Sequence, residues 1–357
     1  MKRFGLFLCA LTLVSLRPIL AETREYTLPE LLQIVIKSNE QIQIAESKVG
    51  QMRLLPWRAA AQITPRLSAS GNYIRQSVVS SGVGTVVPNE QRTYVANVKW
   101  PIWQFEFLAR TAQGYHLIRN AEEEYRGTIQ DVTYSAIGAY LEFLKAEQLQ
   151  KLAVSYVKQA EKHLAIARSR FKVGETRKTA LLQAELDLLR AQKRQIEASH
   201  GMDLAEAALR AWVPGLPEDF SLQEWTEIPA QPFEGKTLTE ILSIAQKNRP
   251  DLLALSASAH AMESDESAAT MRLFPTLSID GQYQIIDPAS AFSLDRSYRI
   301  TGTLSVPIFQ GGDEYLSRID YGLQVREARL RLTAQTKQAE IAVRRAYLEW
   351  DGSRKSH

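Results

Sequence analysis

Two hydrophobic periods alternate along the chain and predict its elements. From Thr27 to Ile63, apolar residues recur every three or four positions, the spacing of an amphipathic helix. After Pro65 the period becomes two, which is typical of a strand with one apolar and one polar face. Both periods recur in the second half of the chain. The pattern therefore predicts a mixed but mainly α protein in which helix, β-hairpin and long helix follow one another twice.

The first half, residues 22–212, begins with Thr27 and Glu30 at the spacing of a capping box. Its long proline-free segment of nearly 70 residues would form a helix of about 100 Å, which needs neighbouring helices along its length. Gly174 then reverses the chain into a second helix. The predicted elements are a helix over 27–63, strands over 66–76 and 92–101, a long helix over 104–172 and a return helix over 178–212.

The second half repeats the first at an offset of about 210 residues. Pro275 follows Pro65 at this offset, and residues 100–104 (Trp-Pro-Ile-Trp-Gln) return as residues 306–310 (Val-Pro-Ile-Phe-Gln). An offset kept across a helix and a strand indicates duplication. The predicted segments are a Pro- and Gly-rich linker over 213–236, a repeat over 237–350 with a helix 238–273, strands 276–286 and 297–306 and a helix 312–350, and a tail over 351–357.

The N-terminus has the layout of a secretory signal peptide. Lys2 and Arg3 precede an apolar run that Arg17 closes early, and cleavage is expected after Ala21, so residues 1–21 would be removed. A retained N-terminal anchor is the alternative. Removal lowers the count of basic residues from 43 to 40, equal to the 40 acidic ones, so the mature chain is neutral. It would also remove Cys9, the only cysteine.

No catalytic constellation stands out in the sequence. The five histidines are scattered, without an HExxH motif or a spacing typical of a metal site. Gly82 and Gly84 resemble the start of a dinucleotide motif but open no helix. No basic patch interleaved with aromatic residues suggests a nucleic acid partner. The sequence therefore predicts no catalytic, cofactor or metal site, and a protein that is not an enzyme.

An exported chain with two polar–apolar hairpins is typical of an outer membrane barrel. Four strands cannot close a barrel with a lumen, because even the smallest have about eight, so several chains must share one. The sequence also resembles the TolC-like outer membrane efflux proteins over residues 25–350. The resemblance rests on the helix–proline–strand joints and on three runs, which are residues 171–174 (Phe-Lys-Val-Gly), 181–186 (Leu-Leu-Gln-Ala-Glu-Leu) and 306–312 (Val-Pro-Ile-Phe-Gln-Gly-Gly).

The resemblance implies a homotrimer with a twelve-stranded barrel in the outer membrane of a Gram-negative bacterium and an α-helical barrel in the periplasm. It implies a passive channel of a tripartite efflux or type I secretion system, which binds a periplasmic adaptor and, through it, an inner-membrane transporter. The counterpart of residues 144–212 is missing after residue 350, where the family's gate residues would be expected. The alternative is therefore a truncated, non-conducting periplasmic scaffold. The substrate is not predicted.

The resemblance also gives expected places to individual residues. The turn of Phe171, Val173, Gly174 and Glu175 would be the periplasmic tip that meets the adaptor. Four prolines would join strands to helices, namely Pro65, Pro101, Pro275 and Pro307. The aromatic residues expected to face lipid or form a girdle, unless they fill a soluble core, are Tyr73, Tyr94, Trp100, Trp103, Tyr283, Tyr298 and Phe309.

Overall fold

The computed structural model describes residues 24–77, 79–81, 84–217, 219–224, 233, 235–289, 294–309 and 311–356. The predicted signal peptide, residues 1–21, lies outside these ranges. The chain divides into two compact units. The first unit comprises Met1–Asn39 and Thr133–Ile228, and the second comprises Glu40–Val132 and Pro229–His357.

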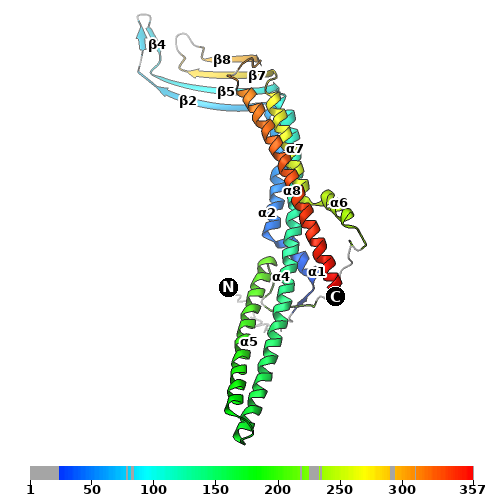
Figure 1. The fold of residues 1–357 in the computed structure, drawn as a ribbon. Coiled ribbons are helices and arrows are strands. Elements are labelled where there is room, and N and C mark those ends of the chain that lie inside the picture. Colours follow the sequence, from blue (N-terminus) through cyan, green and yellow to red (C-terminus); the bar gives the residue numbers. More distant parts are fainter. Residues whose placement is uncertain are drawn as a thin grey trace, which may run out of the picture. The chain divides into compact units, whose positions relative to one another are not determined.

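The first unit is a helical hairpin with a short helix and a parallel ladder beside it (Figure 1). The hairpin consists of α4 (Glu106–Lys172), from Thr133 onward, and α5 (Lys178–Trp212). Helix α1 (Leu28–Ser38) opens with the predicted capping box, in which the backbone N–H of Glu30 donates to Thr27 Oγ1 at 3.4 Å. Strand β1 (Arg24–Tyr26) pairs in parallel with β6 (Phe220–Leu222).

Tyr140 links α4 to the chain beside β6. Its side chain is 1% exposed, and its hydroxyl donates a hydrogen bond to the backbone carbonyl of Gln223. Burial, and secondarily the negative charge of Glu25, raises the pKa of Tyr140. The ring of Phe143, one turn further along α4, lies 5.3 Å from that of Phe220. These contacts stabilise the pairing of β1 with β6, which is only three residues long and so has few backbone hydrogen bonds of its own.

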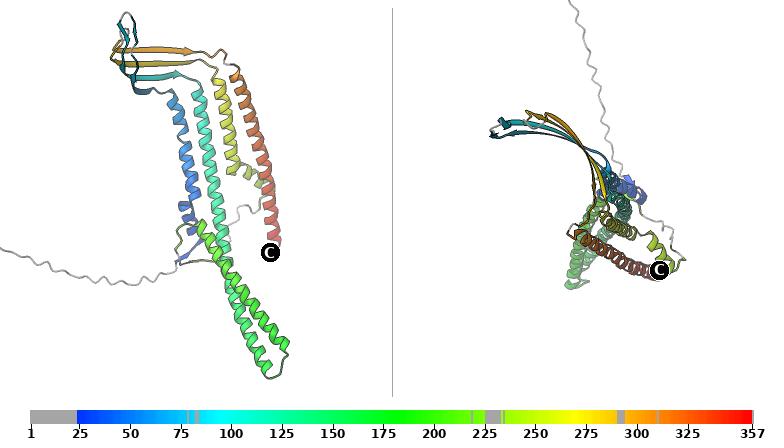
Figure 2. Two further views of the ribbon diagram at one scale, coloured as in Figure 1. Left: turned by 90° about the vertical axis from the view of Figure 1, so that its left-hand side faces the viewer. Right: turned by 90° about the horizontal axis from the view of Figure 1, so that it is seen from above.

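The second unit contains a four-stranded antiparallel sheet and a group of helices at its end (Figures 1 and 2). Strand order is β2, β5, β7, β8, so the two predicted hairpins are confirmed and β5 pairs with β7 to join them. The strands are β2 (Arg66–Arg75), β5 (Glu90–Trp103), β7 (Thr276–Asp287) and β8 (Arg296–Ser305). The helices, besides the first part of α4, are α2 (Glu40–Met52), α3 (Leu55–Ala60), the 3₁₀ turn η1 (Ala61–Ile63), α6 (Leu238–Asn248), α7 (Pro250–Met271) and α8 (Asp313–Ser356).

Two predicted helices are interrupted. The helix expected over 238–273 breaks at Arg249, which is extended at φ −68° and ψ 120°. Pro250 causes this, because the ring of a proline excludes the residue before it from the helical region. The helix expected over 27–63 breaks at Asn39, whose Nδ2 lies 3.5 Å from the carbonyl oxygen of Trp212, and again before α3.

The predictions at Pro101 and at the tail were also wrong. Strand β5 does not end at Pro101 but continues to Trp103, and its register against β7 shifts between these two residues. Proline is tolerated inside a sheet at such an irregularity because the ladder there needs no N–H. The tail over 351–357 does not leave the helical pattern, since α8 extends to Ser356. An ion pair of 2.6 Å between Lys355 and Asp351 supports this last turn.

Two segments expected to be irregular contain short strands. The loop expected between the first two strands holds an antiparallel pair, β3 (Val79–Ser81) and β4 (Gly84–Val87). The linker expected over 213–236, most of whose second half lies outside the described residues, contains β6. Strands of three or four residues escape a search for periodicity because they contain at most two alternations. Among the described helices, none is long and apolar enough to span a bilayer.

Replacing Tyr140 with Phe tests the link to β6. The change removes one hydrogen-bond donor from a buried site and keeps the ring, so unfolding should become easier by about 1 kcal/mol. We expect a lower thermal midpoint in detergent and faster amide exchange over Phe220–Leu222. Tyr134→Phe is the matched control, because Tyr134 is on the same helix and 80% exposed. Equal effects of the two changes would contradict this account.

Candidate functional site

The cross-strand register gathers the apolar residues of the sheet onto one face. Residues directly opposite on adjacent strands share a face, and successive residues alternate. One such row crosses all four strands as Ala69, Ala96, Tyr283 and Tyr298. The apolar and small residues of this face are Leu67, Ala69, Gly71, Tyr73, Tyr94, Ala96, Val98, Trp100, Leu277, Ile279, Gly281, Tyr283, Ile285, Tyr298, Ile300, Gly302 and Leu304, and at its loop end the face also carries Arg75, Glu90, Arg92, Asp287 and Arg296.

The opposite face of the sheet is polar. A row on this face crosses the strands as Ser68, Asn97, Gln282 and Arg299. The remaining residues of this mainly polar face are Arg66, Ser70, Asn72, Ile74, Gln91, Thr93, Val95, Lys99, Pro101, Thr276, Ser278, Asp280, Gln284, Ile286, Ser297, Thr301, Thr303 and Ser305. The chain thus builds a sheet with one face suited to lipid and the other to water.

The sheet has two open edges. Within the described residues, β2 pairs only with β5 and β8 only with β7. The outer backbone N–H and C=O groups of these two strands therefore have no partner strand in the described part of the chain. Seen from above, the sheet is curved rather than flat (Figure 2). Curvature and open edges are what one sector of a barrel requires.

The predicted aromatic residues lie at two levels of the sheet. Trp100 and Trp103 are at the end nearest the helices, where the indole Nε1 of Trp100 donates to the carbonyl oxygen of Ile63 at 3.2 Å. The ring of Phe105 lies 5.4 Å from that of Trp103 and 5.3 Å from that of Phe274. The other group lies toward the loops and spans three successive rows, with Tyr283 and Tyr298 in the first, Tyr94 in the second and Tyr73 in the third; these residues are between 45% and 80% exposed.

The predicted proline joints differ in position. Pro65 and Pro275 come directly before β2 and β7, and Pro307 follows the end of β8 by two residues. Pro101 lies inside β5, as described above. Phe309, beyond Pro307, is 82% exposed.

The predicted tip is the turn between α4 and α5. Gly174 has φ +79°, and its N–H donates to the carbonyl of Phe171 at 3.1 Å. The N–H of Glu175 donates to the carbonyl of Arg170 at 2.9 Å, so the pair of bonds forms a Schellman cap. Val173 is 70% and Phe171 39% exposed at this turn.

A groove runs between α4 and α5 next to the turn, and we call it the tip groove. Its volume is about 760 Å³. Small side chains open it, and basic side chains outnumber the one acid, Asp187. The residues that line it include Ala160, Ala167, Ala180, Ala184, Ala191, Arg170, Arg190 and Arg194.

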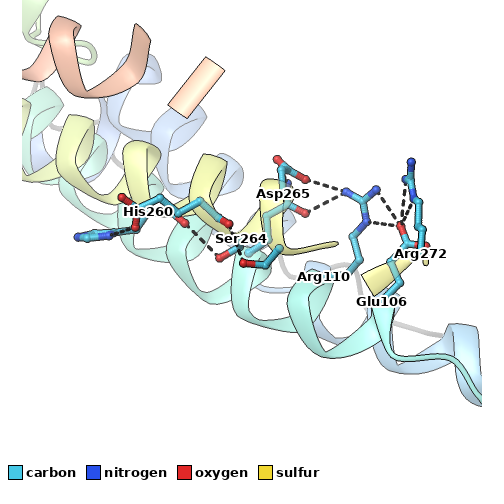
Figure 3. Close-up of polar contacts among 9 residues, drawn as sticks. Glu106, Arg110, His260, Ser264, Asp265 and Arg272 are labelled. Carbon is cyan, nitrogen blue, oxygen red and sulfur yellow. Dashed lines mark hydrogen bonds and ion pairs between the residues drawn. The ribbon is translucent and has the colours of Figure 1, made fainter. Parts of the chain in front are cut away.

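A largely buried ionic network joins α4 and α7, and the sequence pattern did not predict it (Figure 3). Arg110 Nη1 lies 2.8 Å from Asp265 Oδ1, and its Nη2 lies 3.1 Å from Glu106 Oε1. Arg272 Nη2 binds the same Glu106 oxygen at 3.0 Å, and the amide of Gln113 donates to Asp265 Oδ2 at 2.6 Å. The side chains of Asp265 and Glu106 are 10% and 16% exposed. The network fixes the two helices to each other near the sheet.

Burial raises the pKa of Asp265, and the charge of Arg110 and the hydrogen bond from Gln113 oppose this. The carboxylate is therefore costly to ionise without its partners. The sequence offered one signal for this site. Asp265 stands in a stretch of α7 where Ala257, Ala261 and Ala268 are buried, and an acid at such a position needs a partner.

The described residues contain no group of three or more His, Cys, Asp or Glu side chains arranged to hold a metal ion. Two histidines that looked scattered in the sequence do meet. The rings of His116 and His260 lie 5.5 Å apart between α4 and α7, and His260 Nδ1 lies 3.0 Å from Glu263 Oε2.

Comparison with known proteins places the chain among outer membrane efflux proteins. A sequence model of the family described as "Outer membrane efflux protein" matches residues 31–213, just over half of the chain. The chain is 22% identical over 237 residues to the outer membrane efflux protein BepC of Brucella suis biovar 1 (strain 1330), a match covering 66% of this chain and 51% of BepC. The chain thus spans about half the length of this curated relative.

Crystal structures of outer membrane channels share the fold. The CmeC outer membrane channel of Campylobacter jejuni matches 92% of this chain and 73% of its own, with a TM-score of 0.73 and 16% identity. CusC, whose structures concern folding and transmembrane channel formation, matches 92% of this chain and 78% of its own, with a TM-score of 0.72 and 14% identity. The expectation of a mainly helical protein of TolC-like fold is thereby confirmed.

Substitution of Gly174 tests the tip turn. Gly174→Ala would meet no atom within 4 Å, so its cost comes only from the positive φ and amounts to about 1 kcal/mol. Gly201→Ala is the control, because Gly201 is also in open space but lies inside α5, where alanine should stabilise the helix. We expect thermal midpoints to shift in opposite directions. A shift in the same direction would show that the φ of Gly174 does not matter.

Replacing Arg110 with Gln tests the buried network. Asp265 would lose the cation that lowers its pKa, and unfolding should become easier by about 3 kcal/mol at neutral pH. Because its folded pKa would then lie further above the unfolded value of about 3.9, the deficit should shrink as the pH falls toward 4. Thermal midpoints of the variant and the unaltered protein, compared from about pH 4 to about pH 8, measure this pH dependence.

The control for this prediction is Arg331→Gln. Arg331 pairs with Glu327 on α8, and both side chains are exposed, at 71% and 60%. This change should cost no more than about 1 kcal/mol at any pH. A deficit in Arg110→Gln that is constant with pH, or grows in acid, would contradict the role assigned to Asp265.

Proposed function

The chain belongs to the outer membrane efflux protein family, and from this premise we propose that it is the exit duct of a tripartite efflux or type I secretion system. Its location is the outer membrane, and its family consists of channels rather than enzymes. The finer proposal is a passive conduit across the periplasm and the outer membrane. The observation that carries it is the sheet, with one apolar face, one polar face and two open edges.

The proposed assembly is a homotrimer. In lipid, every backbone N–H and C=O must be paired, so the edges of β2 and β8 require further strands. Four strands are too few for a spanning barrel of about eight or more, whereas three copies supply twelve. The curvature of the sheet and its open edges support pairing of β2 from one copy with β8 from the next.

We further propose that the apolar face of the sheet contacts outer membrane lipid. Two levels of aromatic residues, separated by aliphatic ones, fit the girdles that barrels place at the two membrane interfaces. On this proposal Trp100, Trp103 and Phe309 mark the periplasmic interface, and Tyr73, Tyr94, Tyr283 and Tyr298 lie toward the outer one. The polar face would then line a water-filled lumen.

The two halves of the chain are proposed to be structural repeats. Two similar starts support this, because α1 and α6 each open with a Thr–Glu capping box, at Thr27 and Glu30 and again at Thr237 and Glu240. Each opening helix leads through further helical segments to a hairpin of the sheet. A duplicated unit gives a trimer six similar sectors, which suits a ring of even curvature.

The periplasmic part would bind a periplasmic adaptor, and through it an inner-membrane transporter that supplies the energy. The tip with Phe171, Val173, Gly174 and Glu175 is the proposed contact. Exposed Val173 and the adjoining tip groove, open between small side chains, support it. A helix of a partner could pack its side chains into such a groove.

The proposal is tested on the full chain, extracted in mild detergent from outer membrane fractions. We expect trimers that dissociate only on heating and that produce stepwise single-channel currents in planar bilayers. A Gly174→Ala variant should conduct normally, because the tip is outside the sheet. A monomer in the periplasmic fraction without conductance would instead support the scaffold alternative and overturn the proposal.

A further inference from the structure

The polar face of the sheet carries an excess of positive charge. Among its described residues, Arg66, Lys99 and Arg299 are cationic, and Asp280 is the one acid. The other side chains of this face are neutral. The face therefore carries a net charge of about +2 per chain at neutral pH, which three copies would triple.

The four charged residues lie in two adjacent rows near the helix end of the sheet. Arg66, Lys99, Asp280 and Thr301 are consecutive partners across the strands, and Arg299 is in the next row toward the loops. Arg66, Lys99 and Arg299 are exposed, and Asp280 is half-buried. Across the strands, Lys99 therefore lies between Arg66, which has the same charge, and Asp280, which has the opposite charge.

Asp280 offsets only one of the three positive charges of the belt formed by Arg66, Lys99 and Arg299. Its Oδ2 accepts a hydrogen bond from the hydroxyl of Ser278 at 3.1 Å. In the described part of the sheet, no ion pair within 4.0 Å joins it to Lys99 or to either arginine. One carboxylate facing three cations leaves an uncompensated field, since the field of exposed charges reaches about 10 Å at 0.1 M salt.

The excess of positive charge is confined to the polar face, near the helix end of the sheet. The charged residues of the opposite face gather at the loop end, where Arg75 and Glu90 pair at 3.7 Å and Arg92 is the register partner of Asp287. Arg296, on the same face, is the register partner of Ile285. These residues serve as controls because they lie away from the proposed lumen.

We propose that the belt of Arg66, Lys99 and Arg299 makes the sheet section of the channel favour anionic solutes. This inference rests on the proposed function, since it needs the polar face to line the lumen. A wall of fixed cations concentrates anions and repels cations without binding any one ligand tightly. Long, flexible arginine and lysine side chains suit this role, because they offer donors to carboxylate, sulfate or phosphate groups as these pass.

The test measures reversal potentials of full-length trimers in planar bilayers under a KCl gradient. In a variant with Arg66→Gln, Lys99→Gln and Arg299→Gln, the ratio of chloride to potassium permeability should fall about twofold or more near 0.1 M salt. The difference should largely vanish near 1 M, where the screening length is about 3 Å. Glutamine is polar and uncharged, and all three positions are exposed, so the sheet should assemble.

Asp280→Asn supplies the reciprocal test, because it keeps the acceptor for Ser278 and removes the single negative charge. It should shift the permeability ratio toward chloride. A variant with Arg92→Gln and Arg296→Gln is the matched control and should leave the ratio unchanged.

The outcomes separate the two proposals. Currents whose selectivity is the same in all variants, or equally altered by the control, would overturn the anion belt and leave the channel intact. Absence of trimers and of currents in the unaltered protein would instead overturn the proposed function, and the belt with it.

Discussion

The hydrogen-bonding requirement of two strand edges governs the rest of the structure. β2 and β8 each pair on one side within the chain, and the apolar face between them is suited only to lipid or to another apolar surface. A bilayer offers no water to the free N–H and C=O groups of such edges, so they must meet other strands. The aromatic residues, the polar face and the curvature are consistent with our proposal that this sheet is one sector of a larger, closed one.

The helices of each unit show the same incompleteness. In the first unit, Tyr134 and Leu204 are 80% and 72% exposed, and in the second, Leu323 and Leu330 on α8 are 59% and 61% exposed. Such exposed apolar side chains are available for contacts with further helices in the proposed trimer. Inside the second unit, by contrast, the contact of α4 with α7 is closed by the ionic network around Asp265. The ionic network thus fixes this helix contact within the chain.

Periodicity predicted the sheet well, because a two-residue period assigns each side chain to one of two faces. The observed register then puts the apolar residues of all four strands on the same face. The break at Arg249 was readable too, since Pro250 follows it. The break at Asn39 was not, because it coincides with a contact to Trp212, 173 residues away. The ion pair of Arg110 with Asp265 joins residues 155 apart, and no spacing rule connects them. Local sequence patterns predict the helices and strands. Polar contacts between residues far apart in the sequence influence where a helix breaks and which helices are held together.

A disulfide scan tests most directly whether β2 of one copy pairs with β8 of another, as we propose. A cysteine at Ser70 on β2 is combined with a cysteine at successive polar-face positions of β8 from Ser297 to Thr303. Within one chain these strands are three strand spacings, or about 14 Å, apart, beyond the reach of a disulfide. We predict that one or two positions give covalent trimers in outer membranes, while each single cysteine gives none. If every combination remained monomeric, the shared barrel would be contradicted.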